Sequence, residues 1–122
     1  MDEPVASLHT LLVGPDAEWF QLDGGRRVEL LRRGPMRRIL GRLLKAHAAG
    51  REAVSVERLF EAGWPDTDVH PGSAATRVYV TVRMLRKAGL RPVLQTVAGG
   101  YRLDPALRVE HVPDGQQGRR ML

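Results

Sequence analysis

The order of the predicted elements indicates an α+β fold, in which an antiparallel sheet is followed by three helices and a C-terminal β-hairpin. Residues 8–31 contain short apolar runs separated by glycine-rich turns, which is the pattern of β-strands. Residues 34–88 then place apolar residues at three- and four-residue steps, the period of amphipathic helices. Two further apolar runs flank Ala98-Gly99-Gly100, which predicts a second hairpin.

The length and composition indicate one domain. A chain of 122 residues can form one modest core, which we expect to span residues 8–104. Residues 1–7 are expected to be flexible, and residues 105–122 a largely flexible C-terminal extension, because the pattern is lost there. The sequence has no long apolar run and no signal-peptide pattern, so we expect a cytoplasmic protein without membrane contact. The lack of cysteine excludes disulfides and thiolate chemistry.

The N-terminal sheet is expected to have three antiparallel strands. They are predicted at residues 8–13, 18–22 and 26–31. The sequence Gly14-Pro15-Asp16 ends the first strand. Asp23-Gly24-Gly25 joins the other two as a tight hairpin turn, in which glycine supplies the positive φ.

Two amphipathic helices are predicted after the sheet. The first spans residues 34–50, with Pro35 in its first turn and Gly50 at its end. Its apolar face contains Met36, Ile39, Leu40, Leu43, Leu44 and Ala48. The second helix follows a short extended piece, with Ser55 as its N-cap, and stops at Gly63.

The third helix, residues 72–88, contains several valines that would also suit a buried strand. Placing the residues at 100° steps separates two faces, which favours a helix that has Ser73 as N-cap and ends at Gly89. One face contains Ala74, Ala75, Val78, Val82 and Leu85. The other contains Thr76, Arg77, Val80, Arg83, Met84 and Lys87, with Thr81 at its flank.

The second and third helices, joined by a loop and followed by the hairpin at residues 93–104, form a helix-turn-helix with a wing. Three motifs in order resemble the OmpR/PhoB-type winged-helix DNA-binding domain, which also occurs in AfsR-like regulators. They are SVERLFEAGWP, TRVYVTVRMLRKAGL and LQTVAGGYRLDP. The chain departs from this family at Met84 and Ala98, where arginines are common, and in a sheet of three strands where the family commonly has four.

The resemblance implies a DNA-binding protein, most simply a transcriptional regulator. The third helix would enter the major groove and the wing would reach the adjacent minor groove. The resemblance also implies head-to-tail dimers on DNA, and contact between the 64–72 loop and RNA polymerase or another regulator. The expected DNA-binding residues are Thr76, Arg77, Val80, Thr81, Arg83, Met84, Arg86, Lys87, Thr96 and Arg102.

Side-chain chemistry agrees with this assignment. Arg83 and Lys87 suit phosphates or guanine edges, whereas Val80 and Met84 suit thymine methyl groups. A net charge of +5 and a pI of about 10.7 fit a nucleic acid or an acidic partner. The alternative is a winged-helix protein–protein interaction module that has lost sequence-specific DNA reading. Val80 and Met84 would then be an apolar anchor within a charged rim.

Other features of the sequence point to less specific roles. Seven arginines lie between Arg26 and Arg42, where we expect a solvated face away from the third helix, or else a contact with a partner or neighbouring DNA. Asp66, Asp68 and His70 alternate as hard-metal ligands can, but an acidic loop without metal is the simpler interpretation. No P-loop, triad spacing or nucleotide-binding turn is present, so we expect neither an enzyme nor a cofactor.

Overall fold

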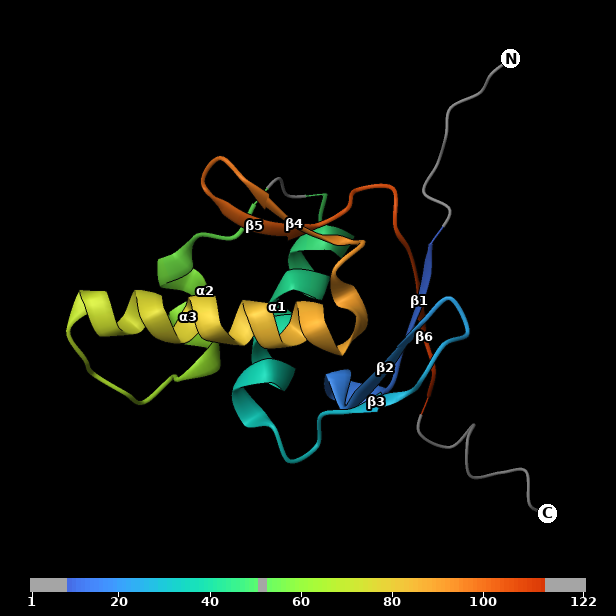
Figure 1. Cartoon of the computed structure of the whole chain (residues 1–122), viewed down its shortest axis with the longest axis horizontal. Helices are drawn as coiled ribbons and strands as arrows, with labels where there is room; N and C mark the ends of the chain where they lie inside the picture. The colour runs from blue at the N-terminus through green and yellow to red at the C-terminus, as the bar shows by residue number, and fades with distance from the viewer. Residues whose placement is uncertain (1–8, 51–52, 114–122) are drawn as a thin grey trace.

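The computed structural model describes residues 9–50 and 53–113. The predicted flexible N-terminus and the last nine residues of the predicted extension lie outside this part of the chain. The strands are β1 (Thr10–Val13), β2 (Trp19–Leu22), β3 (Val28–Glu29), β4 (Leu94–Val97), β5 (Gly100–Leu103) and β6 (Arg108–His111). The helices are α1 (Gly34–Ala48), α2 (Val56–Gly63) and α3 (Pro71–Leu85). The α+β fold with three helices and a C-terminal hairpin is therefore confirmed, in a winged-helix arrangement (Figure 1).

The N-terminal sheet has four strands, in the order β3-β2-β1-β6, so the prediction of three antiparallel strands is wrong. The fourth strand, β6, comes from the segment that the sequence places in a flexible extension, so that prediction is wrong for residues 108–111. This strand runs parallel to β1, with Leu11 opposite Val109. Leu107, just before it, is only 4% exposed. The domain therefore continues beyond residue 104, because its first strand, β1, pairs with β6 near the other end of the sequence.

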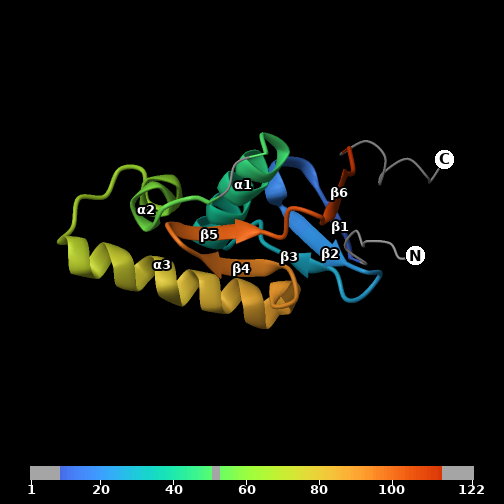
Figure 2. The same ribbon diagram turned by 90° about the horizontal axis from the view of Figure 1, so that it is seen from above.

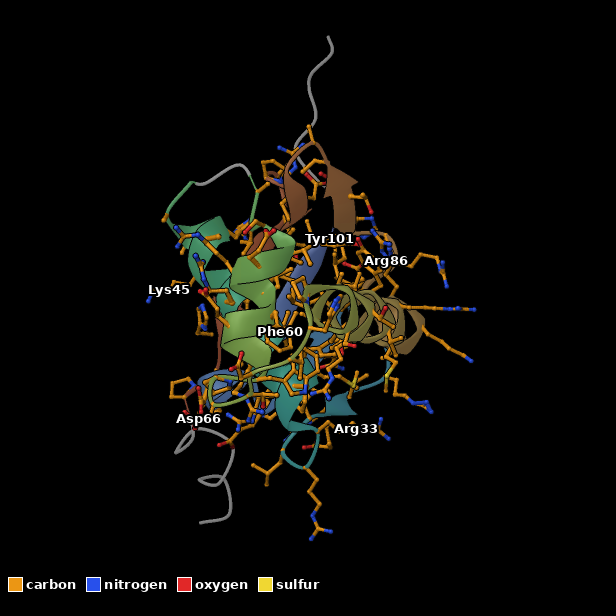
Figure 3. All side chains as sticks on the ribbon, turned by 90° about the vertical axis from the view of Figure 1, so that its left-hand side faces the viewer. Arg33, Lys45, Phe60, Asp66, Arg86 and Tyr101 are labelled. Atoms are coloured by element: carbon orange, nitrogen blue, oxygen red, sulfur yellow. The ribbon has the colours of Figure 1, made fainter. Side chains whose placement is uncertain are left out.

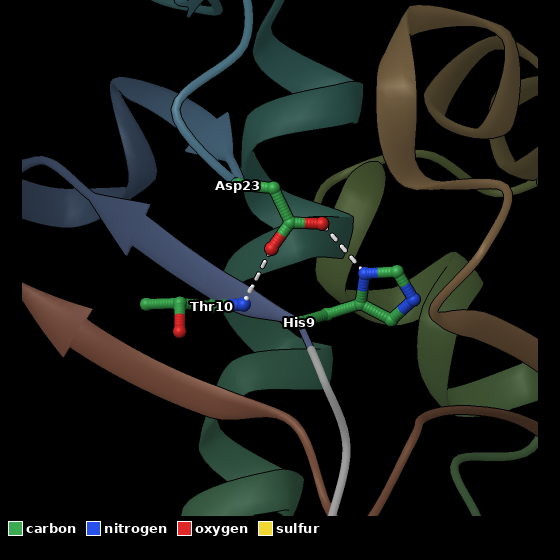
Figure 4. Close-up of polar contacts among 3 residues, drawn as sticks. All are labelled: His9, Thr10 and Asp23. Atoms are coloured by element: carbon green, nitrogen blue, oxygen red, sulfur yellow. Dashed lines mark hydrogen bonds and ion pairs between the residues drawn. The ribbon is translucent and has the colours of Figure 1, made fainter.

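A polar cluster fixes the start of β1 against the turn between β2 and β3 (Figure 4). The Thr10 backbone N–H donates to the Asp23 carboxylate at 2.8 Å, and His9 Nδ1 lies 2.6 Å from the same carboxylate. The hydrogen bond from His9, with that from Thr10, lowers the pKa of Asp23 below its usual value. The turn that the glycines predict is thus also held by side-chain contacts.

The core is built around α1, which packs against α2, α3 and β5. Its predicted apolar residues are buried except Ala48, which is exposed at the last position of the helix. Ser55 caps α2 as predicted, since its hydroxyl accepts a hydrogen bond from the Arg58 backbone N–H at 3.2 Å. Gly63 is the last residue of α2, also as predicted.

The third helix begins two residues before the predicted N-cap. Pro71 is its first residue, and His70 is the N-cap, with Nδ1 accepting a hydrogen bond from the Gly72 backbone N–H at 3.1 Å. Ser73 is therefore inside the helix, because proline favours the first helical position and an imidazole nitrogen replaces the expected hydroxyl. After Leu85 the chain continues as a wider helical turn, which contains Gly89 at φ 141°.

The hairpin β4-β5 forms the wing, and a short bridge holds it to the segment before α2. Val54 and Tyr101 exchange backbone hydrogen bonds of 2.8 and 3.1 Å. Gly100 has φ 143°, and a Cβ at this position would overlap the Val54 carbonyl oxygen. The second glycine of the hairpin is therefore required by close packing against the backbone.

Candidate nucleic-acid interface

One long face of α3 lies on the molecular surface (Figure 2). The predicted exposed set is confirmed, since Thr76, Arg77, Val80, Arg83, Met84 and Lys87 are all exposed. Val78, Val82 and Leu85 on the opposite face are fully buried, which explains how a valine-rich segment folds as a helix. We call the exposed set the α3 face.

The α3 face has more apolar surface than an ordinary solvated helix. Val80 is 51% exposed and Met84 is 39% exposed. Tyr79, which the sequence analysis did not include, is 52% exposed beside them. Exposed apolar side chains among cations are typical of a binding surface rather than of a helix that only faces water.

Thr81 does not belong to the α3 face, so the prediction that it lies at the flank of the exposed face is wrong. This side chain is only 5% exposed. Its hydroxyl donates to the Arg77 carbonyl oxygen, one helical turn earlier, at 2.8 Å. Because this local hydrogen bond satisfies the hydroxyl, a threonine at the edge of the apolar face can be buried at little cost.

Arg86 braces the wing instead of extending toward solvent. Its Nε and Nη2 both donate to the Leu94 carbonyl oxygen, at 3.1 and 2.9 Å, and Nη2 also donates to the Thr96 hydroxyl at 2.8 Å. Its guanidinium lies 5.7 Å from the centre of the Tyr101 ring. Burial of that ring raises the pKa of Tyr101 above its usual value. These contacts explain how the wing is fixed beside α3 (Figure 3).

The predicted wing contacts are also engaged within the protein. Thr96 accepts the hydrogen bond from Arg86, although its side chain is exposed. Arg102 is partly buried, and its Nε donates to Gln95 Oε1 at 2.8 Å. The free cations of the interface are therefore those of the α3 face, above all Arg83 and Lys87, whose side chains have no ion pair or hydrogen bond with any described residue.

Charge is strongly segregated along the chain. The segment 69–103, which contains α3 and the wing, has six Lys or Arg residues and no Asp or Glu. The remaining 87 residues contain 13 cations and 14 acidic residues. The positive net charge of the protein therefore comes entirely from the segment that forms the α3 face and the wing. Sequence analysis missed this signal because it considered only the total charge.

Part of the Arg26–Arg42 cluster stabilises the fold. Arg27 pairs with Glu29 at 2.7 Å, and Arg37 pairs with Asp16 at 2.9 Å. Arg38 donates from Nε and Nη2 to the Gly63 carbonyl oxygen at 3.1 and 2.8 Å.

Arg33 belongs to a different part of that cluster. It lines a hollow of about 440 Å³ together with Met84 and Lys87. The prediction that the whole cluster lies away from the third helix is therefore wrong for Arg33. This proximity comes from the tertiary fold, which brings the start of α1 beside the end of α3.

The 64–72 loop shows a structural role for its histidine. His70 caps α3, and the acidic side chains of Asp66 and Asp68 are exposed. Trp64 stacks on Phe60 with ring centres 5.4 Å apart, which anchors the start of the loop. Within residues 9–50 and 53–113, no group of three or more potential metal ligands is brought together.

Comparisons with protein-family models, with curated proteins and with solved structures find no match for this chain. Within the described residues, no helix is long and apolar enough to cross a membrane.

Proposed function

We propose that this chain binds double-stranded DNA by placing the α3 face in the major groove, and that it regulates transcription as OmpR/PhoB-type proteins do. The observation that supports this most strongly is the segregation of charge. All of the positive net charge lies in the α3-to-wing segment, and the phosphate backbone is the polyanion that such a surface fits.

The dimensions and chemistry of α3 support the same proposal. A major groove about 12 Å wide accepts an α-helix about 10–12 Å in diameter with its side chains. Arg83 and Lys87 have free charged groups for phosphates or guanine edges. Val80 and Met84 are exposed on the same helix face and suit thymine methyl groups. The wing, held by Arg86, would contact the adjacent minor groove.

Two further parts of the proposal rest on the family resemblance alone. Two copies would bind head to tail on DNA, and the 64–72 loop would face RNA polymerase or another regulator. The expected cytoplasmic location comes instead from the amino-acid sequence. With Met84 in place of the common arginine, we expect modest discrimination between sequences, since one bidentate base contact is worth about 1–3 kcal/mol.

The proposal is tested by fluorescence anisotropy with a labelled random-sequence duplex at several salt concentrations. The logarithm of the binding constant should fall with the logarithm of salt concentration, with a slope of about −0.9 per phosphate neutralised. Arg83→Ala with Lys87→Ala should weaken binding and reduce the size of the slope by up to about 2. The matched control is Arg42→Ala with Lys45→Ala, which removes two charges from α1.

The control charges lie on a different surface. Arg42 and Lys45 line a separate hollow with Arg58, and Figure 3 shows Lys45 on the side of the molecule away from α3. The control variant should bind nearly as well as the unmodified protein. Binding that ignores salt, or that survives the α3 substitutions unchanged, would contradict the proposal.

A protein–protein interaction module is the second candidate, and the exposed Tyr79, Val80 and Met84 favour it. Such a module would bind a partner through these apolar side chains and would not bind random duplex at low salt. The same titration therefore separates the two candidates.

A further inference from the structure

The connection between β3 and α1 is a second basic and exposed element. Leu30 is fully buried and anchors it, but Leu31 is 60% exposed, and Arg32 and Arg33 are also exposed. Arg32 has no ion pair or hydrogen bond with the described residues, and the only such side-chain contact of Arg33 is Nη1 at 4.0 Å from Met36 Sδ. The arginines of this connection thus differ from Arg27, Arg37 and Arg38, whose side chains contact other parts of the fold.

The connection lies beside α3, on the side opposite the wing. In Figure 1 the wing is above α3 and the β3–α1 connection is below it. Figure 3 shows the same order, with Arg86 and Tyr101 above the helix and Arg33 below it. The shared hollow, lined by Arg33, Met84 and Lys87, joins the connection to the α3 face.

The electrostatics of this hollow favour an anion. Its lining includes one carboxylate, that of Glu29, which is already paired with Arg27 at 2.7 Å. The charges of Arg33 and Lys87 are therefore not neutralised by this acid. Arg32, which precedes Arg33 in the chain, is exposed and carries a further positive charge.

A major groove is bordered by two phosphate backbones, one on each side of a helix that enters it. The wing occupies one side of α3. We propose that Arg32 and Arg33 contact the phosphates of the backbone on the other side, so that α3 is held between two backbone contacts. This inference rests on the proposed function. It assigns a phosphate-binding role to Arg32 and Arg33. Such contacts position the protein on the duplex but do not distinguish one base sequence from another.

The test compares two double variants in the same salt titration. The first combines Arg32→Ala and Arg33→Ala, and the control combines Arg42→Ala and Lys45→Ala. The first variant should reduce the size of the salt slope by about 1–2 and weaken binding equally on duplexes of different sequence. The control, with the same net charge, should leave the slope unchanged. Arg32→Lys with Arg33→Lys should restore the slope, because lysine also neutralises phosphate.

Circular dichroism and thermal unfolding establish that each variant is folded before binding is measured. An alanine variant that is folded and has the slope of the control would overturn this inference alone, provided that the Arg83 and Lys87 substitutions still weaken binding. Failure of the unmodified protein to bind any duplex would overturn the inference together with the proposed function. If Arg32 and Arg33 bound an acidic protein segment but no duplex DNA, the inference would also be overturned.

Discussion

Arg86 shows how one side chain can have the chemistry of a DNA contact and still act within the fold. In the sequence it belongs to a Leu-Arg-Lys element that the family resemblance places against DNA. In the structure its forked guanidinium joins the end of α3 to β4 through Leu94 and Thr96. The sequence shows the charge of Arg86, but not that a strand carbonyl lies within reach.

Arg86→Ala should lower the free energy of unfolding by about 1–3 kcal/mol, because it removes charge-assisted hydrogen bonds to the wing. Arg86→Lys should recover less than half of this loss, since an ammonium group cannot reproduce the forked contact. Urea unfolding of the two variants measures both effects.

The salt slope of duplex binding distinguishes this structural role of Arg86 from a phosphate contact. Alanine at position 86 should leave the slope for duplex binding unchanged, even if a displaced wing lowers affinity. An Arg86→Ala protein with unchanged stability and a slope smaller by about 1 would return Arg86 to the set of DNA contacts.

At two other residues, Thr81 and Ser73, local interactions decide the outcome. Thr81 was placed at the flank of the exposed face, where a few degrees of helix rotation decide burial, and its hydroxyl has a partner within its own helix. Ser73 was expected to cap α3, but His70 precedes a proline and caps the helix two residues earlier than the helix start that was predicted. Helical periodicity cannot determine either outcome.

At the scale of elements, the helices and the wing were predictable because their signals are local. Apolar spacing defined α1 and α3, Ser55 marked the start of α2, and the glycines at residues 99 and 100 marked the wing. Strand β6 has a much weaker signal, because it has four residues and three of them are polar. It forms by pairing with β1, which lies near the other end of the sequence.

A chain that ends at residue 104, the predicted domain boundary, should be much less stable than one that ends at residue 113. The shorter chain loses all of β6 and the buried Leu107. It also loses the backbone hydrogen bonds from Arg108 to His9 and from Val112 to Val13. Truncation of a buried leucine alone costs about 2–5 kcal/mol.

Thermal unfolding of the two chains measures this difference. We expect the longer chain to unfold cooperatively, and the shorter one to unfold at a clearly lower temperature or to be unfolded. Equal unfolding temperatures would show that β6 does not belong to the stable domain.

At the scale of the whole molecule, the proposed function depends on where the charge lies. The remainder of the chain is nearly neutral, and the segment from residue 69 to residue 103 contains cations without acidic residues. The fold exposes Arg83 and Lys87 on α3, keeps the wing on one side of this helix, and places the β3–α1 connection on the other. Charge counts along the sequence could have identified the first feature, but only the tertiary fold shows the last.

The central claim is that duplex DNA lies against the α3 face, and chemical-shift mapping tests it most directly. Backbone amide spectra of the ¹⁵N-labelled protein would be recorded during titration with unlabelled duplex. We expect the largest shifts in the exposed half of α3, in the wing turn and at residues 31–33, and little change around Lys45 on α1. Shifts concentrated around Lys45 or along β6, with α3 unaffected, would contradict the account.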